Sequence, residues 1–200
     1  MITRARRASA WIIAAGLWPC AGLAADRVDE KLVATETADR IELTVPVSRL
    51  ILSFPKGKLA AVTEERSGAQ VHPRYFFYAD AESKLQVSGW IESEREFDGF
   101  KTFWRKLKAA MKESGLEPVE TPTPLQEGGW VGIAYDLKPA ADSGVVASNI
   151  RAELLQADTW VDLHISIVTD GRAAEAREEL MKFLKDIAVQ EKDAGVTGRR

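Results

Sequence analysis

The sequence feature that most constrains the fold is a pair of alternating runs in residues 149–168, NIRAELLQADTWVDLHISIV. Apolar side chains recur at every second position in each run, and a period of two is that of a β-strand. A short segment, residues 156–159, joins the two runs. These residues therefore predict a β-hairpin at the centre of the fold.

Placing Leu155 opposite Trp160 sets the register of this hairpin. The apolar pairs that then share one face are Leu154 with Val161, Ala152 with Leu163, and Ile150 with Ile165. A slip of one residue would turn these side chains to the polar face, so their burial fixes the register. The polar residues of both runs share the opposite face.

Alternation elsewhere predicts further strands. The expected strands are residues 41–54, 58–65, 74–79, 85–91 and 130–137, with a short edge strand over 116–120. Pro46 cannot donate a ladder hydrogen bond, so the first of these strands should be bent or lie at an edge. The third and fourth strands should form a hairpin around residues 80–84.

Two stretches have the period of an amphipathic helix. The apolar stripe of the first is Phe97, Phe100, Trp104, Leu107 and Met111, and that of the second is Ala173, Ala176, Leu180, Phe183 and Ile187. Ser93 or Asp98 can cap the first helix and Gly115 can stop it, while Asp170 can cap the second. Such stripes most often pack on a core, so both helices should lie on a sheet.

The order of elements predicts an α+β protein, an antiparallel sheet flanked by two amphipathic helices in a layered sandwich. A chain of 200 residues fits one domain. The expected divisions are a signal peptide over residues 1–25, a flexible lead-in over 26–40, one α+β domain over 41–190 and a frayed tail over 191–200.

The first 25 residues have the composition of a secretory signal peptide. Three arginines precede a short apolar run and a stretch of small residues. The apolar run is shorter than the ~20 residues of a spanning helix, so cleavage after Ala24 would leave no transmembrane helix in the mature chain. We expect a periplasmic protein, and the alternative is a lipid anchor at Cys20.

Removal of this signal changes the charge balance. The chain has 27 basic and 30 acidic residues, and loss of the three arginines leaves a formal charge of about −6, which argues against a nucleic-acid partner. Cys20 is the only cysteine, so an apolar core and not a disulfide must stabilise the domain.

The basic residues on the first helix predict a solvated face, with attachment to a membrane surface as the alternative; they are Lys101, Arg105, Lys108 and Lys112.

The polar face of the central hairpin is one candidate site. Its register sets Glu153 opposite Asp162, and Arg151 opposite His164. A catalytic triad with Ser166 is excluded, because alternate residues on one strand stand about 6.5 to 7 Å apart. Glu153, Asp162 and His164 could instead bind a metal ion such as zinc. The other interpretation is a solvated ladder in which Arg151, diagonal to Asp162, offsets the two opposed acids.

Tryptophan marks a second candidate site. Trp90, Trp130 and Trp160 each stand at a strand position opposite the cleaner apolar set of that strand, and if they share one face of the sheet, that face is not simply solvated. Either a helix or the lead-in packs over them, or they line a partly open groove for an apolar or sugar-like ligand or a partner protein.

The layout as a whole resembles a known fold. The exported signal is followed by PVSRLILSFP, by FDGFKTFWRKLKAAM after the first hairpin, and by WVDLHISIV before the last helix. This order over residues 41–188 is similar to the PsbP-like fold, which includes periplasmic DcrB-like proteins. The resemblance implies a central antiparallel sheet flanked by helices, and an accessory, assembly or binding role, but it assigns no functional residue.

The sequence therefore predicts an exported periplasmic accessory or binding protein that acts without catalysis and without a cofactor. Its partner would be an envelope protein or a small ligand. The alternative function is a metal-dependent enzyme that uses Glu153, Asp162 and His164.

Overall fold

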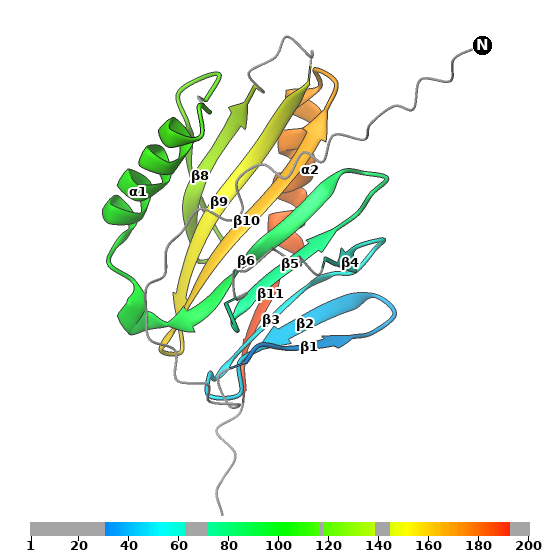
Figure 1. The fold of residues 1–200 in the computed structure, drawn as a ribbon. Helices are drawn as coiled ribbons and strands as arrows, with labels where there is room; N and C mark the ends of the chain where they lie inside the picture. Colours follow the sequence, from blue (N-terminus) through cyan, green and yellow to red (C-terminus); the bar gives the residue numbers. More distant parts are fainter. Residues whose placement is uncertain (1–30, 63–71, 117, 139–144, 193–200) are drawn as a thin grey trace, which may run out of the picture.

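Two antiparallel sheets and two α-helices make up the fold (Figure 1). The structure is a computed structural model and describes residues 31–62, 72–116, 118–138 and 145–192. The larger sheet has the order β4-β5-β6-β10-β9-β8-β7, and its strands are β4 (Ala60–Ala61), β5 (Tyr75–Ala79), β6 (Leu85–Ser93), β7 (Thr123–Glu127), β8 (Trp130–Leu137), β9 (Val146–Gln156) and β10 (Thr159–Thr169). The predicted α+β class is confirmed, and the predicted signal peptide lies outside the described residues.

The hairpin of β9 and β10 is the centre of the larger sheet and has the predicted register. Leu155 pairs with Trp160 and Glu153 pairs with Asp162. Ala157 and Asp158 both have positive φ, 52° and 58°, as a two-residue type I′ turn requires. The alternation of apolar residues was therefore sufficient to predict this pairing.

A second, four-stranded sheet was not expected. It has the order β1-β2-β3-β11, with β1 (Val33–Glu36), β2 (Arg40–Thr44), β3 (Leu50–Pro55) and β11 (Ala188–Glu191). The single bent strand predicted over 41–54 is wrong, because the chain turns at residues 45–49 and β2 pairs with β3. The expected lead-in over residues 26–40 contains β1, which pairs with β2. The strand β11 begins inside the predicted domain and ends at Glu191, and residues 193–200 of the predicted tail lie outside the described part.

One face of the larger sheet is covered by α2 (Ala173–Asp186) and by the smaller sheet (Figure 1). Phe54 of β3 joins these layers, because its ring packs 5.6 Å from that of Tyr78 and 6.2 Å from that of Phe183. Leu163, Ile165 and Leu180 are fully buried in the same core. We call this the α2 face of the sheet.

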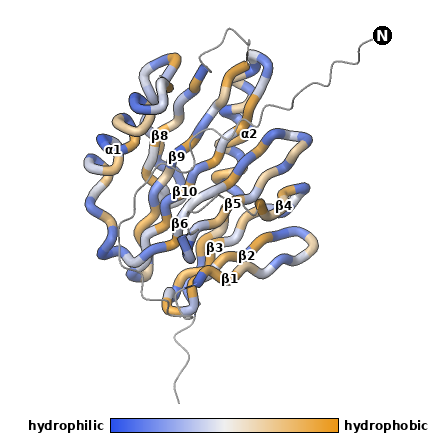
Figure 2. Tube along the Cα trace, viewed as in Figure 1, coloured by the Kyte–Doolittle hydropathy of each residue, from blue (hydrophilic) through white to orange (hydrophobic). Residues whose placement is uncertain are grey.

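The opposite face carries α1 (Phe100–Glu113), which lies beside β8 (Figure 1). Figure 2 shows hydrophilic and hydrophobic residues alternating along α1, as in an amphipathic helix. Met111 is buried against Tyr135 and Leu137. Gly115 ends the helix as predicted, with φ at 66° and the amide of Leu116 donating to the carbonyl of Met111 at 2.9 Å, the pattern of a Schellman motif. We call this the α1 face.

Other predicted boundaries shift. Ser93 caps the short 3-10 helix η2 (Glu94–Glu96), and Gly99 precedes α1. The edge strand predicted over 116–120 is reduced to a bridge between Pro118 and Leu137, and the edge of the sheet is β7. The strand predicted over 58–65 shortens to β4, although residues 63–65 lie outside the described part. None of the described helices is long and apolar enough to span a membrane.

Candidate functional site

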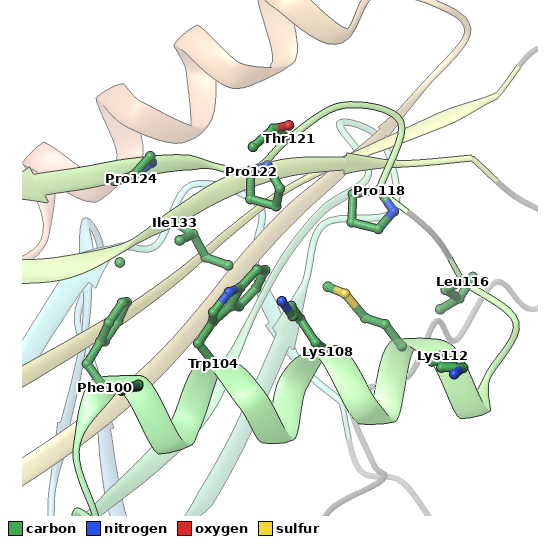
Figure 3. A pocket seen from close by; sticks show the side chains of 13 residues that line it. Phe100, Trp104, Lys108, Lys112, Leu116, Pro118, Thr121, Pro122, Pro124 and Ile133 are labelled. Atoms are coloured by element: carbon green, nitrogen blue, oxygen red, sulfur yellow. The ribbon is translucent and has the colours of Figure 1, made fainter.

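A groove of about 680 Å³ lies between α1 and the edge formed by β7 and β8 (Figure 3). We call it the α1 groove. Its apolar walls include Phe100, Trp104, Met111, Leu116, Pro122 and Ile133. This volume is within the range of about 300 to 1,000 Å³ that is typical of small-molecule sites.

The sequence explains why α1 leaves space here. Pro118, Pro122 and Pro124 line the far side of the groove, and a proline can neither donate a ladder hydrogen bond nor continue a central strand. Pro124 therefore lies on the edge strand β7. On the helix side, Phe100 and Trp104 remain partly exposed, whereas the neighbouring Phe103 is only 2% exposed. The helix thus buries one aromatic residue in the protein and presents two to the groove.

Three lysines also line the groove: Lys101, Lys108 and Lys112. The Nζ atom of Lys108 lies 5.5 Å from the ring centroid of Trp104, which is a cation–π distance (Figure 3). Among the described residues that line the groove, none carries a carboxylate. The groove therefore combines an apolar wall with positive charge.

A buried polar cluster of Arg151, Glu153 and Asp162 lies on the α1 face of the larger sheet. Arg151 Nη2 donates to Asp162 Oδ2 at 2.6 Å, and both side chains are less than one tenth exposed. The guanidinium lies 5.6 Å from the ring of Trp90 and 5.4 Å from that of Phe103. The predicted pairing of Arg151 with Asp162 is confirmed, but the prediction of a solvated ladder is wrong, because Arg151, Glu153 and Asp162 are all buried.

The second carboxylate of this cluster is in a different state. Burial raises the pKa of Glu153 well above its ordinary value, and the neighbouring Asp162 carboxylate raises it further. Trp160 Nε1 donates to Glu153 Oε2. Within the described residues, Glu153 Oε1 and Asp162 Oδ1 have no donor partner. These conditions favour a neutral Glu153, whose proton can satisfy both oxygens.

His164 does not join Glu153 and Asp162 in a metal site. Its Nε2 atom lies 3.0 Å from Asn149 Oδ1, and burial together with the charge of Arg151 lowers its pKa to about 3. Asp162 is paired with Arg151. Among the described residues, no group of three histidine, cysteine, aspartate or glutamate side chains is arranged to hold a metal ion.

The three predicted tryptophans do not share a face. Trp90 pairs with Asp162, so Trp90 and Trp160 lie on the α1 face, where they pack against Tyr75 at 4.9 Å and Phe97 at 5.5 Å respectively. Trp130 lies on the α2 face and is 2% exposed. The condition of a common face is not met, because Val131, not Trp130, pairs with Glu153.

The tryptophan that lines a groove is Trp104, which the sequence pattern assigned to the core. Its place in the apolar stripe of α1 is consistent with burial against the sheet and also with exposure to a groove. Periodicity shows that a side chain lies on the apolar side of a helix, but not what that side faces. The signal that could have distinguished them is the run of prolines over 118–124, which predicts an edge that cannot close over the helix.

Comparison with known proteins bears on the fold. The solution structure of cyanobacterial PsbP (CyanoP) from Synechocystis sp. PCC 6803 matches with a TM-score of 0.51 and 12% identity over 87% of this chain and 99% of that chain. The chain has a PsbP-like fold. The predicted resemblance is therefore confirmed at the level of the fold, and at 12% identity it transfers no functional residue.

Two further solved structures match less well. The Ran-binding protein Mog1p of Saccharomyces cerevisiae has a TM-score of 0.45 and 11% identity, covering 79% of this chain and 96% of that chain. A structure from Bacteroides thetaiotaomicron VPI-5482 has a TM-score of 0.41 and 9% identity, covering 74% of this chain and 46% of that chain. No family model and no curated protein matches the sequence.

Proposed function

We propose that the protein is an exported, non-catalytic binding protein of the bacterial envelope, and that the α1 groove is its ligand site. The observation that carries this proposal is the pair Phe100 and Trp104, two aromatic side chains that the helix leaves partly exposed to a groove of about 680 Å³. Apolar surface removed from water contributes roughly 25 cal/mol per Å², so a ligand with an apolar body is stabilised there.

A small ligand fits this groove better than an envelope protein does. Protein interfaces bury roughly 800 Å² on each partner, whereas the α1 groove is a local depression between one helix and one sheet edge. The buried polar cluster is a weaker candidate, because Arg151 is ion-paired with Asp162 and its guanidinium lies beside Trp90 and Phe103, away from solvent. Lysine is the one titratable residue type among the described residues that line the groove, which supports binding over acid–base catalysis.

The groove can be tested with N-phenyl-1-naphthylamine, an uncharged apolar probe that fluoresces when it leaves water. The variant Thr121→Trp would fill the groove, because Thr121 is exposed and lines it. Thr123→Trp is the matched control, since Thr123 is an exposed threonine of the neighbouring edge strand that does not line the groove. We expect saturable fluorescence with the wild type and the control, and a loss of at least fivefold in affinity with Thr121→Trp. Equal binding by all three proteins, or no binding by the wild type, would contradict the proposal.

Export is tested separately by fractionating cells that express the full chain. We expect the protein in the periplasmic fraction with Ala25 as its first residue, as cleavage after Ala24 requires. A protein that stays in the cytoplasm with residues 1–25 attached would exclude export. A membrane-bound form that Cys20→Ser releases would instead show a lipid anchor.

A further inference from the structure

The charge around the α1 groove narrows the class of ligand, and this inference rests on the proposed function of that groove. We propose that the ligand is a free single-chain anionic amphiphile of the fatty-acid type. Its alkyl chain would lie along Phe100 and Trp104, and its carboxylate would be held by Lys108, whose ammonium lies beside Trp104. Lys101 and Lys112 flank Lys108 on the same side of the helix, and we call these three residues the lysine row.

The spacing of these lysines places them on one side of the helix. Successive residues of an α-helix turn by about 100°, so positions 101, 108 and 112 fall within about 40° of one line around the axis and span about 16 Å along it. The apolar residues Phe100, Trp104 and Met111 follow a second line about 80° away. The helix thus presents a positive line and an apolar line, side by side and of similar length.

The lysine row has no competing partner in the described part of the chain. The described ion pairs of α1 involve Lys106, which contacts Asp98 at 2.5 Å, and not the three lysines of the row. Lys108 is held beside Trp104 at 5.5 Å, which brings one positive charge to the apolar wall itself. Positive charge and apolar surface therefore meet at one point of the groove.

The attraction for an anion is local and does not come from the protein as a whole. The whole chain carries a formal charge of −3, so at long range it repels anions. The lysines can act only over roughly a Debye length, about 8 to 10 Å in ordinary buffers. A ligand must enter the groove to gain from them. This condition favours a single chain with one anionic head over a flat anionic surface.

Isothermal titration calorimetry with sodium decanoate, below its micelle concentration, tests whether a negative charge on the ligand strengthens binding to the groove. The uncharged probe with the same chain is 1-decanol. We expect the wild type to bind decanoate at least tenfold more tightly than decanol. In the triple variant Lys101→Gln, Lys108→Gln, Lys112→Gln the two affinities should become equal. Raising the salt concentration from 50 to 300 mM should weaken decanoate binding and leave decanol binding unchanged.

The outcomes separate this inference from the proposed function. Equal binding of decanoate and decanol by the wild type would overturn the anionic ligand class and leave an apolar groove. Failure of decanoate, decanol and N-phenyl-1-naphthylamine to bind would overturn the groove itself.

A vesicle experiment distinguishes a free amphiphile from a membrane surface. The wild type is sedimented with vesicles of phosphatidylglycerol and, as a control, of phosphatidylcholine. We expect neither to carry the protein down at physiological salt. Sedimentation with phosphatidylglycerol vesicles and no binding of decanoate would contradict the proposal in favour of an anionic membrane.

Discussion

The two faces of the seven-stranded sheet differ in the side chains that they bury and in how they are covered. The α2 face is mainly apolar, and two layers cover it, α2 and the four-stranded sheet; Phe54, Leu163 and Leu180 are fully buried in its core. The α1 face buries an ion pair, Arg151 with Asp162, and is closed by one helix that leaves a groove at its edge. One face holds the fold together, and the other has the features of a binding surface.

The chemistry of the two faces explains this difference. A buried aliphatic side chain contributes roughly 1.5 to 3 kcal/mol, so the α2 face stabilises the fold directly. Two charges taken out of water cost several kcal/mol each, and their attraction in a buried pair does little more than offset that cost. The α1 face therefore adds less net stability for the area that it buries. Removing either Arg151 or Asp162 alone should nevertheless lower the free energy of unfolding, because the remaining charge would be buried without a partner.

The largest expected effect comes from the buried pair. Arg151→Met should lower the free energy of unfolding by about 3 to 5 kcal/mol, because it leaves Asp162 buried without its cation. Urea unfolding followed by circular dichroism measures the change. Adding Asp162→Asn to the same protein should recover at least half of the loss. If Arg151→Met alone costs less than about 1 kcal/mol, the cluster is solvated and the α1 face is not closed as described.

The second largest effect is the difference in unfolding free energy between removing a leucine from α2 and removing one from α1. Leu180→Ala, on the α2 face, should cost about 2 to 5 kcal/mol, because the side chain is fully buried and leaves a cavity. Leu107→Ala, on the α1 face, should cost less than about half as much, since that leucine is only partly buried. Urea unfolding of the two variants gives the ratio. Equal losses would remove the asymmetry between the faces.

A third effect is the pH dependence that Glu153, on the α1 face, gives to the free energy of unfolding. The folded state raises the pKa of Glu153 above its ordinary value of 4.5, so the native state binds more protons than the unfolded state above that pH. Stability from this group is complete below pH 4.5 and falls as pH rises toward the raised pKa, by at most about 1.4 kcal/mol per pH unit. Burial is the largest cause of this raised pKa; among the groups that face Glu153, Asp162 raises the pKa further, and Arg151 and Trp160 lower it.

The variant Glu153→Gln checks this sign, because it keeps a group that accepts from Trp160 and cannot ionise. Unfolding free energies of wild type and variant, measured from pH 4.5 to 8, should diverge so that the wild type loses stability relative to the variant. A difference that is flat with pH, or that slopes the other way, would show that Glu153 is ionised in the native state.

The smallest effect on stability should come from the lysine row. Lys108→Gln should change the free energy of unfolding by no more than about 0.5 kcal/mol, because Lys108 is exposed and its contact with Trp104 is a surface one. The same variant should weaken binding of decanoate, which calorimetry measures. A large loss of stability would mean that Lys108 serves packing.

The sequence pattern predicted correctly those features of the fold that depend on residues close together in the chain. Alternation gave the register of β9 and β10, and the stop at Gly115 followed from a residue that accepts positive φ. The strand pair β2 and β3 was missed because apolar residues recur on both sides of the turn at residues 45–49, although their alternation changes phase between Val47 and Leu50. The strand β11 was missed because it has four residues and pairs with β3, which lies far away in sequence.

The candidate site was predicted only in part. The polar cluster could be found from the register, but its burial depends on where α1 packs, which the sequence of the hairpin does not contain. Trp104 was identified as part of the apolar stripe, but its partial exposure depends on the proline segment across the groove. A groove between distant elements is a tertiary property, and periodicity within one element does not specify it.

The central claim, that ligand binds on the α1 face and not on the α2 face, is tested most directly by nitrogen-15 NMR of the tryptophan indoles during a titration with sodium decanoate. Trp104 lines the groove, and Trp130 is buried in the α2 core and serves as an internal control. We expect a saturable shift of the Trp104 indole signal with Trp130 unchanged. A shift at Trp130 with none at Trp104, or no shift at either, would contradict the account.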